Sequence, residues 1–373
     1  MATDYIFKNE PIDMWYVDDI NKMLLWAVDI KASDVNLEPN KPIWIKVDGK
    51  WHQATSRKLN SQEIFMLMDR MTRDDGCSAR VQSGEPEPFG YDIKIDQYKK
   101  QSFRGEATAC KEGWEIGGII TLRVGQALPP THETLGLEPE LLEAATPENG
   151  LVLVTGVMGS GKTTLIAAIL RHIIETKHKS VATFEDPIEF DYSAIKNPTG
   201  PVSQAEVPLH LKTFEACIKN ATRRALDVIL MGELRDLPTM SGTFEAAEIG
   251  VAAYGTLHTK SVPETPSRII NKFPDSVQNQ IATTMMSAAR LFIQQRLVPK
   301  IGGGRIAIKE WLEFDEADRT ELIKLPTAQL TPAINELLQA KGHPLLMDVE
   351  EKLNAGLIPE KEYLKVKKEK QVA

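Results

Sequence analysis

Cysteine is scarce in this sequence, and its scarcity excludes two kinds of site. The three cysteines, Cys77, Cys110 and Cys217, lie far apart in 373 residues and form no C-x-x-C pair. A zinc-binding module needs closely spaced cysteines and a disulfide framework needs several of them, so neither zinc nor disulfides are predicted. Reduced thiols are the simple interpretation, and they suit a cytoplasmic protein.

Long apolar runs are also missing. No run approaches the roughly 20 residues that a membrane-spanning helix requires. The first ten residues, MATDYIFKNE, are acidic and contain no apolar core of a signal peptide. We therefore expect a cytoplasmic chain that associates with the inner membrane only peripherally, through partners.

An excess of positive charge is absent as well. The chain has 44 Lys and Arg residues against 52 Asp and Glu residues, a net charge of −8. Direct nucleic-acid binding is therefore not expected. With 42% apolar and 26% charged residues, the composition is that of an ordinary globular protein, and 373 residues are enough for two domains.

One stretch, residues 151–165 with the sequence LVLVTGVMGSGKTTL, carries the strongest signal that is present. The apolar residues 151–154 are typical of a buried parallel strand. The following residues match G-x-x-x-x-G-K-[ST], with Gly156, Gly161, Lys162 and Thr163 in the required places. A helical segment, LIAAILRHIIE, continues the motif. Together these features predict a site for a nucleoside triphosphate, and they disfavour the alternative of a glycine-rich turn without function.

Each residue type in this motif has a chemical reason. Glycine lets the backbone approach phosphate closely, and the N–H groups of the turn form an anion nest at a helix N-terminus. We expect Lys162 to reach the β- and γ-phosphates of ATP and the Thr163 hydroxyl to hold Mg²⁺. The predicted nucleotide-binding residues are Gly156, Val157, Met158, Gly159, Ser160, Gly161, Lys162, Thr163 and Thr164.

Acidic residues follow two further predicted strands. In TFEDPIEF, residues 183–190, the carboxylates of Glu185, Asp186 and Glu189 fall within five residues, which is costly unless a cation or water network shares them. A solvated acidic loop is the alternative. Residues 227–233, DVILMGE, read as an apolar strand ending in Gly-Glu. This pattern indicates that Glu233 acts on Mg²⁺ or on the attacking water.

A histidine follows a fourth apolar run. His258 lies near the end of residues 253–259, AYGTLHT. At a strand end on the same edge as the phosphate loop, it could bond a γ-phosphate or a catalytic carboxylate. A lone histidine is about as often structural, so spacing alone leaves both roles open.

The predicted elements divide the chain into domains. Residues 1–124 combine amphipathic helices with strands, among them a hairpin over 43–53 with Asp48-Gly49 as its turn, and predict a mixed α+β domain. Residues 125–137 read as a linker stiffened by Pro129-Pro130, although a loop within one domain is the alternative. Alternating strands and helices over 138–300 indicate a parallel sheet covered by helices, and 301–373 are expected to be helical.

Taken together, these blocks resemble the motifs of the type II/type IV secretion ATPase superfamily, the traffic ATPases of pili, secretion and conjugation. GVMGSGKTT resembles its Walker A motif, FEDPIEF its Asp box, DVILMGELRD its Walker B motif and GTLHT its His box. ASDVNLEP, PIWIKVDG, FRGEATA and ITLR resemble parts of its PAS-like N-terminal domain. The likeness covers about residues 18–300 and is greatest to the PilT-like pilus-retraction branch. Within it, the DotB and TraJ ATPases of type IVB secretion and IncI-like conjugation are most similar.

The resemblance implies an α/β fold in which a PAS-like N-terminal α+β domain precedes a RecA-like P-loop ATPase domain with a parallel sheet and a helical C-terminal region. It makes Glu233 the catalytic glutamate and His258 the His-box sensor. The acids that organise metal and water would be those of the Asp box: Glu185, Asp186 and Glu189.

The resemblance also points to arginines outside the ATPase domain. The family's arginine fingers lie in strands that match Phe103-Arg104-Gly105 and Thr121-Leu122-Arg123, which implies that role for Arg104 and Arg123; surface salt bridges are the alternative. One departure concerns the His box, which often has a second histidine before Arg-Ile. This sequence has Ser267 there, so that histidine's role is in doubt.

The implied function is ATP hydrolysis by a homohexamer that drives substrate or subunit movement through a type IV secretion, conjugation or pilus apparatus. Its partners would be inner-membrane components of that apparatus, and its cofactor Mg²⁺. A RecA-like nucleic-acid motor is the main alternative, and the acidic net charge disfavours it. A small-molecule kinase and a scaffold that binds ATP without turnover are further alternatives.

Overall fold

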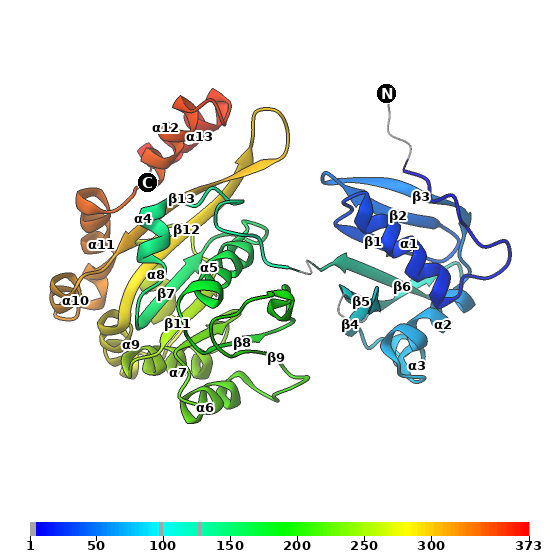
Figure 1. Ribbon diagram of the computed structural model, residues 1–373, viewed down its shortest axis with the longest axis horizontal. Coiled ribbons are helices and arrows are strands. Elements are labelled where there is room, and N and C mark those ends of the chain that lie inside the picture. Colours follow the sequence, from blue (N-terminus) through cyan, green and yellow to red (C-terminus); the bar gives the residue numbers. More distant parts are fainter. Residues whose placement is uncertain (1–4, 97–99, 126–127, 373) are drawn as a thin grey trace. The chain divides into compact units, whose positions relative to one another are not determined.

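The chain divides into two compact units, with the boundary along the sequence between residues 127 and 128 (Figure 1). The computed structural model describes residues 5–96, 100–125 and 128–372. The division falls within the predicted linker, residues 125–137, of which residues 126 and 127 lie outside the described residues.

The first unit is an antiparallel sheet with three helices packed against it (Figure 1). Its strand order is β3-β2-β1-β6-β5-β4. Asp48 and Gly49 have φ values of 50° and 78°, as the two-residue turn of the predicted hairpin requires. The bounds are α1 Val17–Asp29, β1 Asp34–Leu37, β2 Pro42–Val47, β3 Lys50–Lys58, α2 Ser61–Thr72, α3 Cys77–Gln82, β4 Glu87–Lys94, β5 Lys100–Glu112 and β6 Glu115–Val124.

The second unit is built on a seven-stranded sheet of order β13-β12-β7-β11-β10-β8-β9. Neighbouring strands are parallel except for the β12–β13 pair, which is antiparallel. The four predicted strands are confirmed as β7 Gly150–Thr155, β8 Val181–Glu185, β10 Val228–Met231 and β11 Ala252–Leu257. Three strands were not predicted: β9 Val202–Glu206, β12 Ala289–Pro299 and β13 Arg305–Glu313.

Both faces of this sheet are covered by helices, which explains why its central strands are apolar throughout. In β7, Leu151 and Leu153 join the core formed with helices α6 to α9, whereas Val152 and Val154 join the core formed with α4 and α5. A strand buried on both faces has no polar side to alternate with. The helix bounds are α4 Pro139–Ala144, α5 Lys162–Thr176, α6 Phe214–Arg223, α7 Leu237–Glu248, α8 Thr265–Ile270 and α9 Asp275–Ala288, with a short 3-10 helix η1 at Tyr192–Ala194.

The region after residue 300 differs from the expected all-helical segment. It begins with β13, which pairs with β12 as a long hairpin, drawn yellow to orange in Figure 1. Gly302, Gly303 and Gly304, all at positive φ, form its turn. The sheet therefore extends past the predicted boundary at residue 300. Helices follow only then: α10 Glu316–Leu322, α11 Thr327–Lys341, α12 Leu345–Asn354 and α13 Glu360–Val372. Over the described residues, none of the helices has the length and apolarity that crossing a bilayer would need.

Candidate active site

The glycine-rich turn between β7 and α5 has the backbone that its sequence predicts. Gly156, Gly159 and Gly161 have φ values of 145°, 73° and 84°, which residues with a Cβ rarely adopt. Gly161 caps α5 in the left-handed conformation. The turn therefore leads directly into the N-terminus of α5. At that end of a helix, free amide groups and the helix dipole favour the binding of an anion.

Lys162, the first residue of α5, is folded into this turn. Its side chain is buried, and Nζ donates to the carbonyl oxygens of Gly156 at 2.9 Å and Val157 at 3.1 Å. Burial lowers the pKa of Lys162, while the nearby carboxylates of Glu233 and Glu189 act in the opposite direction. The ammonium therefore contacts the loop and interacts electrostatically with two of the predicted acidic residues.

The strand ends next to β7 bring three predicted motifs to one edge of the sheet. β11 is the neighbour of β7, and β10 and β8 follow, all parallel, so their carboxyl ends share that edge. His258 after β11 lies 3.4 Å from Glu233 after β10, measured from Nε2 to Oε1. Its Nδ1 is 3.1 Å from the carbonyl oxygen of Gly156, and because a carbonyl only accepts, Nδ1 donates. His258 thus joins Glu233 to the P-loop.

Arg235 is a second partner of Glu233, and sequence reasoning did not single it out. Its Nη2 is 2.9 Å from Glu233 Oε2, and its Nη1 is 3.6 Å from Asp186 Oδ2. The residue is visible in the Walker B block GELRD, but only the folded chain shows which acids it bridges. Glu233, with 29% of its side chain exposed, is thereby held between a guanidinium and an imidazole.

The three Asp-box acids differ in their surroundings. Glu185 ends β8 and is buried, whereas Asp186 and Glu189 are exposed. Burial raises the pKa of Glu185 to about 7, although a 2.6 Å hydrogen bond from the Thr183 hydroxyl favours the ionised form. One of the three carboxyl groups is therefore buried, and the other two are accessible to a cation or to water.

The two predicted arginine fingers are cross-strand neighbours in the sheet of the first unit. Arg104 on β5 is the register partner of Arg123 on β6, and both are exposed. Arg123 Nε donates to Asp34 Oδ1 at 3.1 Å, so the salt-bridge alternative holds for part of its guanidinium. Within the described residues, Arg104 has no ion-pair partner. The arginines belong to the first unit and the P-loop to the second.

Ser267 occupies the place where the family often has a second histidine, and here it contributes to helix packing. It lies on α8, and its hydroxyl donates to the carbonyl oxygen of Glu264 at 3.0 Å. The Thr331 hydroxyl of α11 donates to Ser267 Oγ at 3.3 Å. The position therefore joins two helices.

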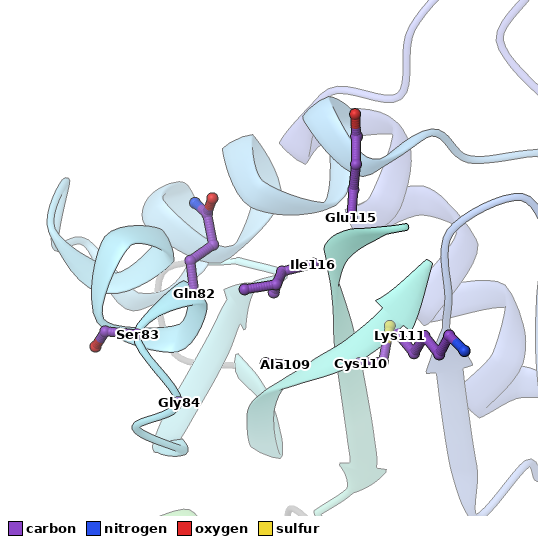
Figure 2. A pocket seen from close by; sticks show the side chains of 8 residues that line it. All are labelled: Gln82, Ser83, Gly84, Ala109, Cys110, Lys111, Glu115 and Ile116. Carbon is purple, nitrogen blue, oxygen red and sulfur yellow. The ribbon is translucent and has the colours of Figure 1, made fainter. Parts of the chain in front are cut away.

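An open hollow in the first unit contains none of the predicted site residues (Figure 2). Burial raises the pKa of the Cys110 thiol at its wall, which disfavours the reactive thiolate. The lining residues of the hollow are Gln82, Ser83, Gly84, Ala109, Cys110, Lys111, Glu115 and Ile116.

Comparison with known proteins assigns the family. The family model described as type II/IV secretion system protein matches residues 13–305. The chain belongs to this family. The type IV pilus retraction ATPase PilT of Pseudomonas aeruginosa is 30% identical over 331 residues, covering 85% of this chain and 88% of the relative.

Two solved structures are similar to this chain in fold as well as in sequence. The X-ray structure of the Legionella pneumophila ATPase DotB matches with a TM-score of 0.86 and 33% identity, over 97% of this chain and 98% of that one. The crystal structure of the pilus retraction motor PilT with bound ADP matches with a TM-score of 0.79 and 28% identity, over 93% and 96% of the two chains. These findings confirm the predicted PilT-like branch, the closeness to DotB, the α/β fold with a parallel sheet, and an ATP-hydrolysing enzyme.

Proposed function

We propose that this family member is the ATP-hydrolysing subunit of a homohexameric ring that moves substrates or subunits through a type IV pilus, secretion or conjugation apparatus. Family membership and the likeness to PilT and DotB support the type of machine. One observation carries the chemistry: Glu233 contacts His258, and His258 contacts the P-loop carbonyl of Gly156.

The loop fits the phosphates of ATP. Ser160 Oγ is buried and, among the described residues, has no hydrogen-bond partner, so it is available to a phosphate oxygen. Lys162 Nζ now donates to the carbonyl oxygens of Gly156 and Val157. When ATP binds, it would donate to phosphate oxygens instead, because these carry more negative charge than carbonyl oxygens do. The phosphates would thus be held by the amides of the turn and by one ammonium group.

The residues at this edge also suit Mg²⁺, which prefers hard oxygen ligands. The Thr163 hydroxyl would bind it in the first turn of α5, and the exposed carboxylates of Asp186 and Glu189 would hold water molecules around it. When bound, Mg²⁺ neutralises charge on the β- and γ-phosphates.

Glu233 would orient or deprotonate the attacking water. Arg235 and His258 hold its two carboxylate oxygens, so its orientation is set before ATP arrives. Little covalent chemistry is left to the protein, because phosphoryl transfer depends mainly on positioning and on charge stabilisation. Glu185, with its raised pKa, would support the network around the Asp box as a hydrogen-bonding group.

Arg104 and Arg123 would complete the site from a neighbouring subunit. A guanidinium stays charged and binds phosphate oxygens bidentately, which suits a finger. In the proposed hexamer, a heterologous contact of one subunit's first unit with the next subunit's second unit would repeat around a closed ring. We further propose that the ring works in the cytoplasm, on inner-membrane components of the apparatus.

The test separates binding from chemistry at Glu233. Glu233→Gln keeps the side chain's shape but removes the base, so ATP binding should persist while phosphate release falls at least about 100-fold. Glu245→Gln, at an exposed position of α7, is the matched control and should keep both. Binding and phosphate release are measured on one preparation. If Glu233→Gln keeps its turnover and Glu189→Gln loses it, the base lies in the Asp box.

A second measurement addresses the alternatives. The ATPase rate should be the same with and without single-stranded DNA, and phosphate should be transferred to water. Stimulation by DNA that weakens as salt is raised would instead indicate a nucleic-acid motor.

A further inference from the structure

Gln295 contacts the phosphate-binding loop from a distant part of the chain. It lies on β12, which runs parallel to β7 and pairs with it up to the residue before the loop. Only 4% of Gln295 is exposed. Its amide Nε2 donates to the carbonyl oxygen of Ser160 at 2.8 Å. The loop is therefore anchored to a strand that is 135 residues away in sequence.

The two required glycines of the loop pack against the same residue. A Cβ at Gly156 would lie 2.3 Å from the Gln295 carbonyl oxygen, closer than any real contact. A Cβ at Gly161 would lie 2.9 Å from Gln295 Nε2. Both glycines are therefore required by the close packing of the loop against Gln295, in addition to any requirement that a bound nucleotide imposes.

Holding the Ser160 carbonyl has a consequence for the next amide. The Ser160–Gly161 peptide is planar and trans, so its C=O and its N–H point in opposite directions. Because Gln295 holds the carbonyl, the Gly161 N–H points away from Gln295. We infer that Gln295 is a positioning residue, which orients this peptide so that its amide faces the phosphates. The inference rests on the proposed nucleotide site, although not on hydrolysis.

The chain provides a matched control at the preceding position. Gln294 lies on the same strand and is 1% exposed, but successive side chains of a strand point to opposite faces. Its Oε1 has no hydrogen-bond partner within the described part of the chain. Gln294→Leu therefore removes an equally buried amide without touching the phosphate loop.

The experiment compares Gln295→Leu and Gln294→Leu in the full chain. Fluorescent methylanthraniloyl-ADP measures nucleotide affinity, and steady-state phosphate release gives kcat and KM. For Gln295→Leu we expect about ten-fold weaker ADP binding and a similar rise in KM, as for the loss of one buried hydrogen bond. The kcat should stay within about two-fold, because phosphate contacts made equally in the ground and transition states affect KM alone. Gln294→Leu should keep wild-type affinity.

Hydrogen exchange of the nucleotide-free proteins provides a readout that needs no activity. Peptides covering residues 156–161 should exchange faster in Gln295→Leu than in wild type or Gln294→Leu. Equal affinities and equal exchange in the two variants would overturn the inference. If Gln295→Leu does not fold, Gln295→Asn, which keeps the amide but is too short to reach Ser160, replaces it. A wild-type chain that binds ADP but releases no phosphate would refute the proposed hydrolysis and leave this comparison valid.

Discussion

Glu185 should make the stability of the second unit depend on pH, with a sign and size that follow from its burial. Its side chain is 4% exposed, and burial raises its pKa from 4.5 to about 7. Between these values the folded chain holds the proton and the unfolded chain releases it, so stability falls as pH rises from 4.5 to about 7. At about 1.4 kcal/mol per pH unit, this interval corresponds to about 3 kcal/mol.

Glu185→Gln removes the titration but keeps an oxygen that accepts from the Thr183 hydroxyl. We would measure urea unfolding between pH 5 and pH 8, in EDTA and without nucleotide, by pulsed hydrogen exchange. Peptides from the second unit report on Glu185, and peptides from the first unit in the same samples are an internal control. Relative to wild type, the variant should become more stable by about 2.5 kcal/mol between pH 5 and pH 8, with most of the change below pH 7.

The expected difference concerns only the second unit and only this pH interval. A difference between variant and wild type that stays constant within about 1 kcal/mol from pH 5 to pH 8 would refute the argument that burial controls this carboxyl. An equal pH effect in first-unit peptides would refute its assignment to Glu185.

Three further predictions concern the proposed hydrolysis. Lys162→Ala should reduce phosphate release to background, and residual activity above about a tenth of wild type, a loss of only ~1.4 kcal/mol, would contradict the P-loop assignment. His258→Asn keeps a donor for the Gly156 carbonyl but withdraws from Glu233, so nucleotide binding should persist while kcat falls about ten-fold; equal losses in binding and turnover would argue for a structural histidine. Arg104→Ala and Arg123→Ala should each lose most ATPase activity but keep ATP binding, and mixing either with Lys162→Ala should restore part of it once subunit exchange is shown; no rescue at any ratio would mean that these arginines act in cis or are structural.

Local sequence was sufficient for the features that depend on neighbouring residues. The glycines of the P-loop, the Asp48-Gly49 turn and the four central strands were predicted because backbone conformation and apolar runs are encoded within a few residues. The prediction of a parallel sheet also implied that the acids and His258 lie at the same edge as the P-loop, because parallel strands have their carboxyl ends on one edge.

Contacts between segments that are distant in the sequence could not be predicted from local sequence patterns. β12 and β13 were missed because their side chains mix polar and apolar residues. Among these residues, the buried Gln295 and Glu310 have hydrogen-bond partners far away in the sequence, at Ser160 and Val262. The partners of Arg235 and the burial of Glu185 likewise depend on which strands lie side by side. A local sequence pattern specifies the backbone conformation and the periodicity of apolar residues. Hydrogen-bond partners and desolvation depend on which distant residues come close together, and only the folded chain determines this.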